Sequence, residues 1–128
     1  MSFRESVMQV CDLPPETLVL WDNAQDFRFE NVKKGVVFVF AEWGGVSPLM
    51  LRKYCHLLTT KASTDVKLHV LNHDSLSPAD MERIFSKPLH GYAETYFVLD
   101  GRIVAEIARP DAAAVVRFTR YLDEAFGQ

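Results

Sequence analysis

The chain has 128 residues, which suits one compact domain and is too short for two domains of ordinary size. Hydrophobic residues make up 48% of it and charged residues 24%, which is a globular rather than a disordered composition. The net charge is -3 at pH 7, and no run of Lys or Arg forms the basic stripe that phosphate contacts need. We therefore expect one domain with its own hydrophobic core, and no nucleic-acid partner.

The two cysteines, Cys11 and Cys55, lie 44 positions apart and form neither a Cys-x-x-Cys pair nor a secreted disulfide framework. This pattern fits a reducing, cytoplasmic location. Arg4 and Glu5 interrupt the N-terminus where a signal peptide needs an apolar core, and the longest apolar run, 36–41, is far too short to cross a bilayer. We expect neither export nor a membrane anchor.

The first predicted elements are a helix over residues 2–11 and a strand over residues 17–21. Ser2 and Glu5 have the spacing of a capping box, and apolar residues recur after them at helical intervals. Two prolines then end this helix, because neither can donate a backbone hydrogen bond.

The clearest strand prediction covers residues 35–41, whose β-branched and aromatic side chains occupy both faces, as in a central strand that is covered on each side. A helix follows, with Ser47 as its N-cap and Pro48 at its first helical position, and it runs to about residue 60. Its inward stripe consists of four residues at helical spacing: Leu51, Tyr54, Cys55 and Leu58.

The second half of the chain continues this alternation with a strand over residues 66–71. A helix opens at residues 77–80, where Ser, Pro and Asp stand in the order of N-cap, first position and first turn. Two strand-like runs, 95–99 and 102–107, are joined by the Asp-Gly dipeptide at 100–101. This dipeptide adopts positive φ readily and predicts an antiparallel hairpin.

Pro110 opens the last predicted helix, whose inward face carries four apolar residues: Val115, Phe118, Leu122 and Ala125. The alternation of strands and helices predicts an α/β fold with a parallel-containing sheet that is covered on both faces. We expect three layers, with a mixed sheet of about five strands and a C-terminal hairpin and helix. The expected organisation is an N-terminal helical extension at 1–16 and a single domain at 17–128.

At residues 41–47, Ala-Glu-Trp-Gly-Gly-Val-Ser, this order of elements reaches a point at which the chain resembles the thioredoxin family. In thioredoxins the same central strand ends in a tryptophan that is followed by Cys-Gly-Pro-Cys at a helix N-terminus. The resemblance covers residues 17 to about 126, leaves residues 1–16 outside, and implies a thioredoxin-like three-layer α/β/α fold.

Several parts of the family's redox machinery are missing from this sequence. By position, the two family cysteines fall on Gly44 and Ser47, neither of which supplies a thiol. The family's buried carboxylate falls on Phe38, and its cis-proline falls on Ala93 or Glu94, where we expect a trans peptide bond. Because these parts are missing together, we expect no dithiol oxidoreductase activity and no cofactor.

The first functional hypothesis is a redox-inactive protein-binding module, assembly factor or chaperone-like adaptor that binds another protein or a peptide segment. By resemblance, its surface follows the family's peptide groove and consists of two segments: Trp43, Gly44, Gly45, Val46 and Ser47, and Tyr92, Ala93, Glu94 and Thr95. Each segment also has a structural interpretation. The first is a tight strand-to-helix turn, with Trp43 packed at the strand end and Ser47 as an N-cap, and the second is a plain connection.

A second hypothesis is a glutathione-dependent or monothiol enzyme that uses Ser47 or Cys55, and it requires an exposed group with a lowered pKa. The helical stripe instead predicts that Cys55 is buried, as it does for Cys11 on the N-terminal helix. A third hypothesis is a mainly structural role, in which residues 1–16 or a sheet edge form a homodimer or a larger complex. Its anchors are the apolar residues of the N-terminal helix: Phe3, Val7 and Val10.

Histidines at positions 69 and 73 have the spacing of two zinc ligands on one helix face. Because residues 66–71 predict a strand, His69 and His73 do not share such a face. We expect no metal site.

Overall fold

The computed structural model describes residues 1–61 and 65–127. Within these residues, α-helices, strands and short 3₁₀ turns follow one another in this order: α1 (Phe3–Met8), η1 (Pro15–Thr17), β1 (Leu18–Trp21), η2 (Ala24–Asp26), η3 (Phe29–Asn31), β2 (Lys34–Phe40), α2 (Val46–Lys61), β3 (Lys67–Asn72), η4 (His73–Ser75), α3 (Pro78–Phe85), β4 (Thr95–Leu99), β5 (Arg102–Ile107) and α4 (Ala114–Phe126). The order of helices and strands is the predicted one except between β1 and β2, where residues 22–26 predict a turn or the start of a helix and the structure has only the short 3₁₀ turns η2 and η3. None of the described helices is both long and apolar enough to cross a membrane.

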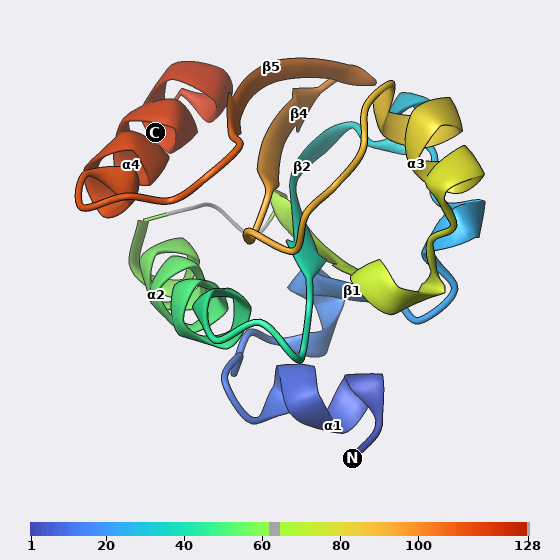
Figure 1. The fold of residues 1–128 in the computed structure, drawn as a ribbon. Helices are drawn as coiled ribbons and strands as arrows, with labels where there is room; N and C mark the ends of the chain where they lie inside the picture. Colours follow the sequence, from blue (N-terminus) through green and yellow to red (C-terminus); the bar gives the residue numbers. More distant parts are fainter. Residues whose placement is uncertain (62–64, 128) are drawn as a thin grey trace.

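The strands form a mixed five-stranded sheet in the order β1-β3-β2-β4-β5 (Figure 1). β3 pairs in parallel with β1 and β2, whereas β4 is antiparallel to β2 and to β5. β2 lies in the middle, and every residue of it except Lys34 is buried. The prediction of a central strand covered on both faces is therefore confirmed.

Successive residues of β2 point alternately into two separate cores, as the two-residue period of a strand requires. Val36 and Phe38 belong to the core beneath α2 and α4, whereas Val37 and Val39 belong to the core on the opposite face of the sheet. Figure 1 shows α2 and α4 on one side of the sheet and α3 on the other. The predicted three-layer α/β/α arrangement is confirmed.

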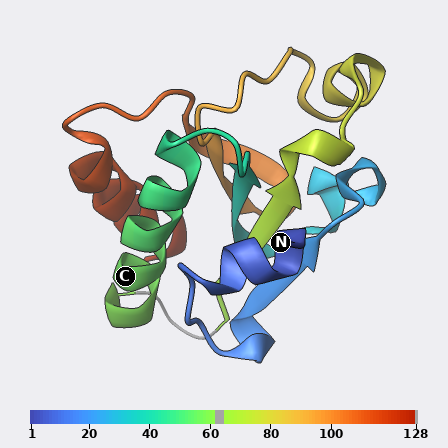
Figure 2. The same cartoon turned by 60° about the horizontal axis from the view of Figure 1, so that its bottom comes forward.

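The N-terminal helix α1 packs on the domain itself. Its predicted capping box is present, with the Ser2 hydroxyl accepting from the Glu5 backbone N–H and the Glu5 carboxylate accepting from the Ser2 N–H. Val7 is fully buried in the core beneath α2, and the Phe3 ring meets the Phe40 ring edge-on. Figures 1 and 2 both show α1 beside α2. Val7 is therefore buried within its own chain, and its side chain is not exposed for contact with a second copy.

The β4–β5 hairpin forms at the predicted dipeptide. Asp100 has φ 51° and Gly101 has φ 80°, the positive values that a tight two-residue hairpin turn needs. Backbone N–H groups of both residues also donate to carbonyls of the segment before β2, at Lys33 and Val32. The turn is thus tied to the centre of the sheet as well as to its own strands.

The prediction that Pro110 opens the last helix is wrong. The helix α4 begins at Ala114, and the residues before it form a turn in which the Asp111 carboxylate accepts from the Ala113 backbone N–H. The same carboxylate pairs with Arg117, one turn into the helix, with N···O distances of 3.1 Å. An aspartate therefore organises the helix start, and the inward face of α4 shifts accordingly to Ala114, Phe118, Leu122 and Phe126.

Candidate functional site

The turn between β2 and α2 holds the first predicted segment. β2 ends at Phe40, Ala41 is still fully buried, and α2 begins at Val46. Ser47 therefore lies inside the first turn of α2, and its prediction as the N-cap is wrong. Its hydroxyl is fully buried and accepts from the Ala41 backbone N–H at 3.1 Å, so it closes the turn from within.

Trp43 lies at the surface of this turn with 60% of its area exposed. Its indole Nε1 donates to the Asp74 carboxylate at 2.7 Å, and its ring meets the His73 ring edge-on, with centroids 5.6 Å apart. A Cβ atom at Gly91, whose φ is +75°, would lie 2.5 Å from the indole Cη2. A glycine at 91 thus lets the edge of the indole rest on the opposite loop while more than half of the Trp43 surface stays exposed.

Gly44 and Gly45 differ in what the fold demands of them. A Cβ atom at Gly44 would lie 3.2 Å from the Gly91 carbonyl oxygen, so this glycine permits close contact between the turn and the opposite loop. A Cβ atom at Gly45 would have nothing within 4 Å, and Gly45 has no positive φ. The interpretation of the glycines as requirements of a tight turn therefore holds for Gly44. At position 45, the fold itself does not require a glycine.

The second predicted segment, residues 92–95, enters β4 through a strained residue. Ala93 has φ 62°, the left-handed region that disfavours a residue with a Cβ atom. No cis peptide bond occurs in residues 1–61 and 65–127, so the expected trans bond at 93 and 94 is confirmed. The Thr95 hydroxyl donates to the Ala93 carbonyl at 2.9 Å and helps to hold this conformation.

Glu94 builds the same loop from inside. Its side chain is buried, and its carboxylate accepts from the backbone N–H groups of His90 at 2.7 Å and Tyr92 at 3.1 Å. Its backbone carbonyl accepts from the Val39 N–H of β2 at 3.0 Å. Hydrogen bonds from N–H groups to an ionised carboxylate are among the stronger ones in proteins. Glu94 therefore fixes the shape of the loop and is not itself available to a partner.

Burial divides the nine predicted residues into two groups. Those that reach the surface are Trp43, Gly44, Gly45, Val46 and Tyr92, and those that are buried are Ser47, Ala93, Glu94 and Thr95. The buried residues hold the turn and loop in shape, and the others form their exposed side.

Two residues outside the predicted segments, Leu49 and Arg109, also contribute to this surface. Leu49 follows Val46 by almost one helical turn and is 52% exposed. Its signal was present in the sequence, since the inward stripe of α2 leaves Leu49 on the outer face. The Arg109 guanidinium lies over the Tyr92 ring, 4.9 Å from its centroid. No sequence pattern links Arg109 to Tyr92, because tertiary packing alone brings them together.

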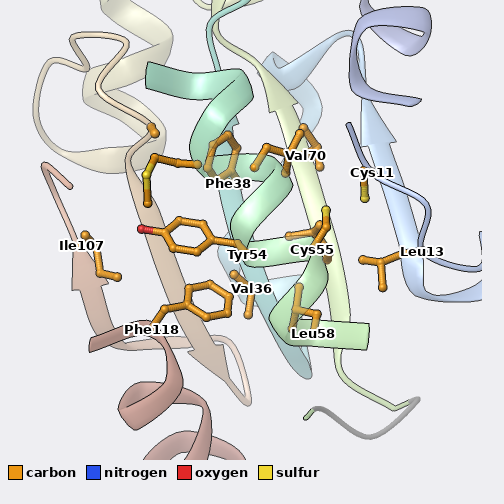
Figure 3. Packing of buried hydrophobic residues seen from close by; sticks show 14 of the residues in the cluster. Cys11, Leu13, Val36, Phe38, Tyr54, Cys55, Leu58, Val70, Ile107 and Phe118 are labelled. Carbon is orange, nitrogen blue, oxygen red and sulfur yellow. The ribbon is translucent and has the colours of Figure 1, made fainter. Parts of the chain in front are cut away.

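Phe38 occupies the position to which the resemblance assigns a buried carboxylate. It is fully buried, and its ring lies edge-on to the Tyr54 ring with centroids 6.0 Å apart. Figure 3 shows both rings in the core between β2 and α2. A hydrocarbon ring cannot accept or release a proton, so general acid–base assistance beneath the turn is absent at this position.

The two cysteines are both 1% exposed, as predicted, and neither forms a disulfide. The hydrogen bond with Cys11, together with burial, raises the pKa of the Cys55 thiol well above its ordinary range. The enzyme hypothesis requires an exposed Ser47 or Cys55 with a lowered pKa, and neither residue meets this requirement. Neither can act as a surface nucleophile in this conformation.

The histidines have structural partners. His69 accepts a hydrogen bond from the Trp21 indole at 3.1 Å and is stacked on that ring, whereas His73 packs against Trp43. Burial, with a smaller contribution from the Lys67 charge, lowers the pKa of His69 to about 4. In the part of the chain that the structure describes, no group of three or more His, Cys, Asp or Glu side chains is arranged to hold a metal ion.

Comparison with solved structures identifies the fold. Thioredoxin O2 from Arabidopsis thaliana is similar with a TM-score of 0.68 at 16% identity, over 90% of this chain and 99% of that one. Mitochondrial thioredoxin 3 from Saccharomyces cerevisiae gives 0.60 at 17% identity, over 93% and 98%. Thioredoxin 2 from Pseudomonas aeruginosa gives 0.56 at 17% identity, over 91% and 93%. No family model and no curated protein matches the sequence. The chain has a thioredoxin-like fold, as its sequence predicted.

Proposed function

We propose that this thioredoxin-like chain is a protein-binding module, of the assembly-factor or chaperone-like kind, that performs no dithiol chemistry at the turn before α2. The observation that carries the proposal is the surface formed there by four exposed apolar side chains, which we call the Trp43 patch: Trp43, Val46, Leu49 and Tyr92. The family's thiol positions are occupied by Gly44 and the buried Ser47, so the patch offers contact area without a nucleophile.

The composition of the patch favours a protein partner. Exposed tryptophan and tyrosine supply large contact areas at a low cost in side-chain entropy, and such residues are enriched where proteins bind one another. The rim carries positive charge from Arg109 beside Tyr92 and from Lys53, one turn beyond Leu49 on the exposed face of α2. Near Trp43 lie two carboxylates that already accept hydrogen bonds within the chain, Asp74 from the indole and Glu42 from the Ser6 hydroxyl. We infer a partner segment that presents apolar side chains flanked by carboxylates.

Recognition would rest on side chains rather than on backbone pairing along the loop. The N–H groups of His90 and Tyr92 both donate to the buried Glu94 carboxylate. Gly45, by contrast, has open space around it, which lets the backbone of a partner approach the turn closely. Two free, buried thiols agree with a reducing cytoplasmic setting, which we propose as the location.

Affinity capture with the purified chain as bait, followed by binding measurements with the recovered partner, tests the proposal. We expect Trp43→Ala to weaken binding by at least about tenfold, as for a central aromatic contact. Val116→Ala is the matched control, because Val116 is 68% exposed on α4 and lies outside the patch. Equal binding by both variants would remove the patch from the proposal. In parallel, turnover in an insulin-reduction assay would contradict the absence of dithiol chemistry.

A further inference from the structure

Cys11 and Cys55 meet inside the protein although 44 positions separate them in the sequence. Cys11 follows α1, Cys55 lies on the inward face of α2, and their thiols are hydrogen-bonded to each other. Figure 3 shows the two sulfur atoms facing each other at the edge of the core. Neighbouring sulfurs on two separate elements are the first requirement for a disulfide bond.

A small hollow on the surface leads to one member of this pair. It has a volume of about 230 Å³, and its walls include Cys11, Met8 and Asp12 from the N-terminal segment and Arg52 and His56 from α2. Cys55 does not line it. The hollow therefore brings a small reagent next to Cys11, and because Cys11 is only 1% exposed, a local opening of this wall completes its access to the sulfur. The Asp12 carboxylate in the same wall acts to raise the pKa of the Cys11 thiol, against the larger effect of its hydrogen bond with Cys55.

We propose that Cys11 and Cys55 form a redox-sensitive pair, in which hydrogen peroxide oxidises Cys11 and Cys55 then closes an internal disulfide. In the first step the Cys11 thiolate attacks one peroxide oxygen, the O–O bond breaks, and a sulfenic acid and hydroxide form; the hydroxide takes up a proton as water. In the second step the Cys55 sulfur displaces the sulfenic hydroxyl, which leaves as water with the thiol proton. The two thiols lose two electrons in all, and the peroxide gains them.

The electrostatics of the pair support this order of events. The hydrogen bond from the Cys55 thiol holds the pKa of Cys11 below its ordinary value, against the opposing effect of burial. The same interaction keeps Cys55 protonated, so its thiol gives up its proton to the departing hydroxyl as the disulfide bond forms. Since both sulfurs are almost fully buried, the pair is suited to a slow change of state rather than to catalytic turnover on protein disulfides.

A disulfide here would tie the N-terminal segment to α2 by a covalent bond. The Cys11 backbone N–H donates to the Val7 carbonyl at 3.0 Å, so Cys11 is continuous with the end of α1. On α1, the Ser6 hydroxyl donates to the carboxylate of Glu42 at 2.8 Å, and Glu42 is the residue directly before Trp43. The redox state of the pair therefore sets how firmly α1 is held beside the turn at 41–47. The inference goes beyond the proposed function and does not depend on it.

The test is to treat the native full-length chain with hydrogen peroxide, block remaining thiols with iodoacetamide, and map the peptides. We expect a Cys11–Cys55 linked peptide that is lighter by about 2 Da than its two thiol components, and that separates on reduction. We also expect the melting temperature of the oxidised protein to rise by roughly 5–10 °C, since the link constrains a long loop of the unfolded chain. Methionine oxidation at the exposed Met8 is identified separately in the same map.

Single substitutions provide the controls. In Cys55→Ser, Cys11 should accumulate sulfenic and sulfinic acid without a linked peptide, whereas in Cys11→Ser the thiol of Cys55 should remain alkylatable after unfolding. Each variant is first checked by circular dichroism, and Cys→Ala replacements are used where serine disturbs the core. The inference is overturned if the wild-type chain yields two alkylated cysteines or over-oxidised Cys11 without a link. Linkage between two chains would overturn it as well. None of these readouts involves a binding partner, so they fail or succeed independently of the Trp43 patch.

Discussion

Compared with the turn at residues 41–47, the Cys11–Cys55 pair differs in both exposure and chemistry. The turn presents Trp43 and Val46 to solvent but contains no thiol, whereas the pair contains two thiols that are each 1% exposed. A thioredoxin-type site needs a thiolate and access to it at one place. In this molecule the same fold keeps the two apart. The exposed surface and the thiols therefore lie in different parts of the molecule, and a substitution in one leaves the side chains of the other in place.

The largest effect that we expect is on thiol reactivity. Gly45→Cys places a thiol in open space beside the start of α2, where a Cβ atom has nothing within 4 Å. Under native conditions it should react with an aromatic disulfide reagent about 1,000-fold faster than Cys11 or Cys55, because those two must wait for local opening. Wild-type labelling as fast as that of the variant would erase the contrast between the two regions.

The next effect concerns the loop that supports the exposed side. Glu94→Ala removes the acceptor of two backbone N–H groups and should lower the free energy of unfolding by about 3 kcal/mol. Urea denaturation measures this change, and Glu82→Ala, at an exposed position on α3, serves as the control with an expected change below about 0.5 kcal/mol. A cost for Glu94→Ala no greater than that of the control would mean that the carboxylate does not hold the loop together.

Acid should weaken the whole fold through His69, a group that belongs to neither region. Its pKa is about 4 in the folded chain and 6.5 without the fold, so between these values the unfolded chain binds more protons. Stability is complete above pH 6.5 and falls as the pH drops, by about 2 kcal/mol from pH 7 to pH 5. His69→Gln keeps an acceptor for Trp21 and should flatten this slope in urea titrations. An unchanged slope in the variant would assign the acid sensitivity to other groups.

Much of the fold was predictable because local rules and tertiary packing agree. The capping box at Ser2 and Glu5 and the hairpin at 100–101 depend on residues close in sequence, and both are present in the structure. The predicted N-cap at Ser47 is wrong because its hydroxyl accepts from Ala41, the residue after β2, instead of from an N–H group of its own helix. The predicted helix start at Pro110 is wrong because Asp111 bonds to Ala113 and Arg117 and forms a turn before the helix begins.

The sequence predicts where in the chain the candidate site lies, but it does not predict how the side chains of the site are arranged. Sequence located the turn beside Trp43, since a tryptophan follows a buried strand and precedes a helix. It gave no sign that Glu94 would turn inward to hold two N–H groups, because that depends on the backbone path through Ala93. The meeting of Cys11 with Cys55 was equally hidden, since it requires α1 to fold back onto α2.

The smallest expected effect distinguishes the two glycines of the turn. Gly44→Ala should cost about 1 kcal/mol, because its Cβ atom would press on the Gly91 carbonyl oxygen at 3.2 Å, and it should shift the fluorescence of Trp43 in a Trp21→Phe background. Gly45→Ala adds the same methyl group one residue later, in open space, and should leave stability within about 0.5 kcal/mol. If both variants lose stability equally, the fold requires both glycines. If Gly45→Ala keeps its stability but binds the partner less tightly, the glycine at 45 is needed for close approach of the partner and not for the fold.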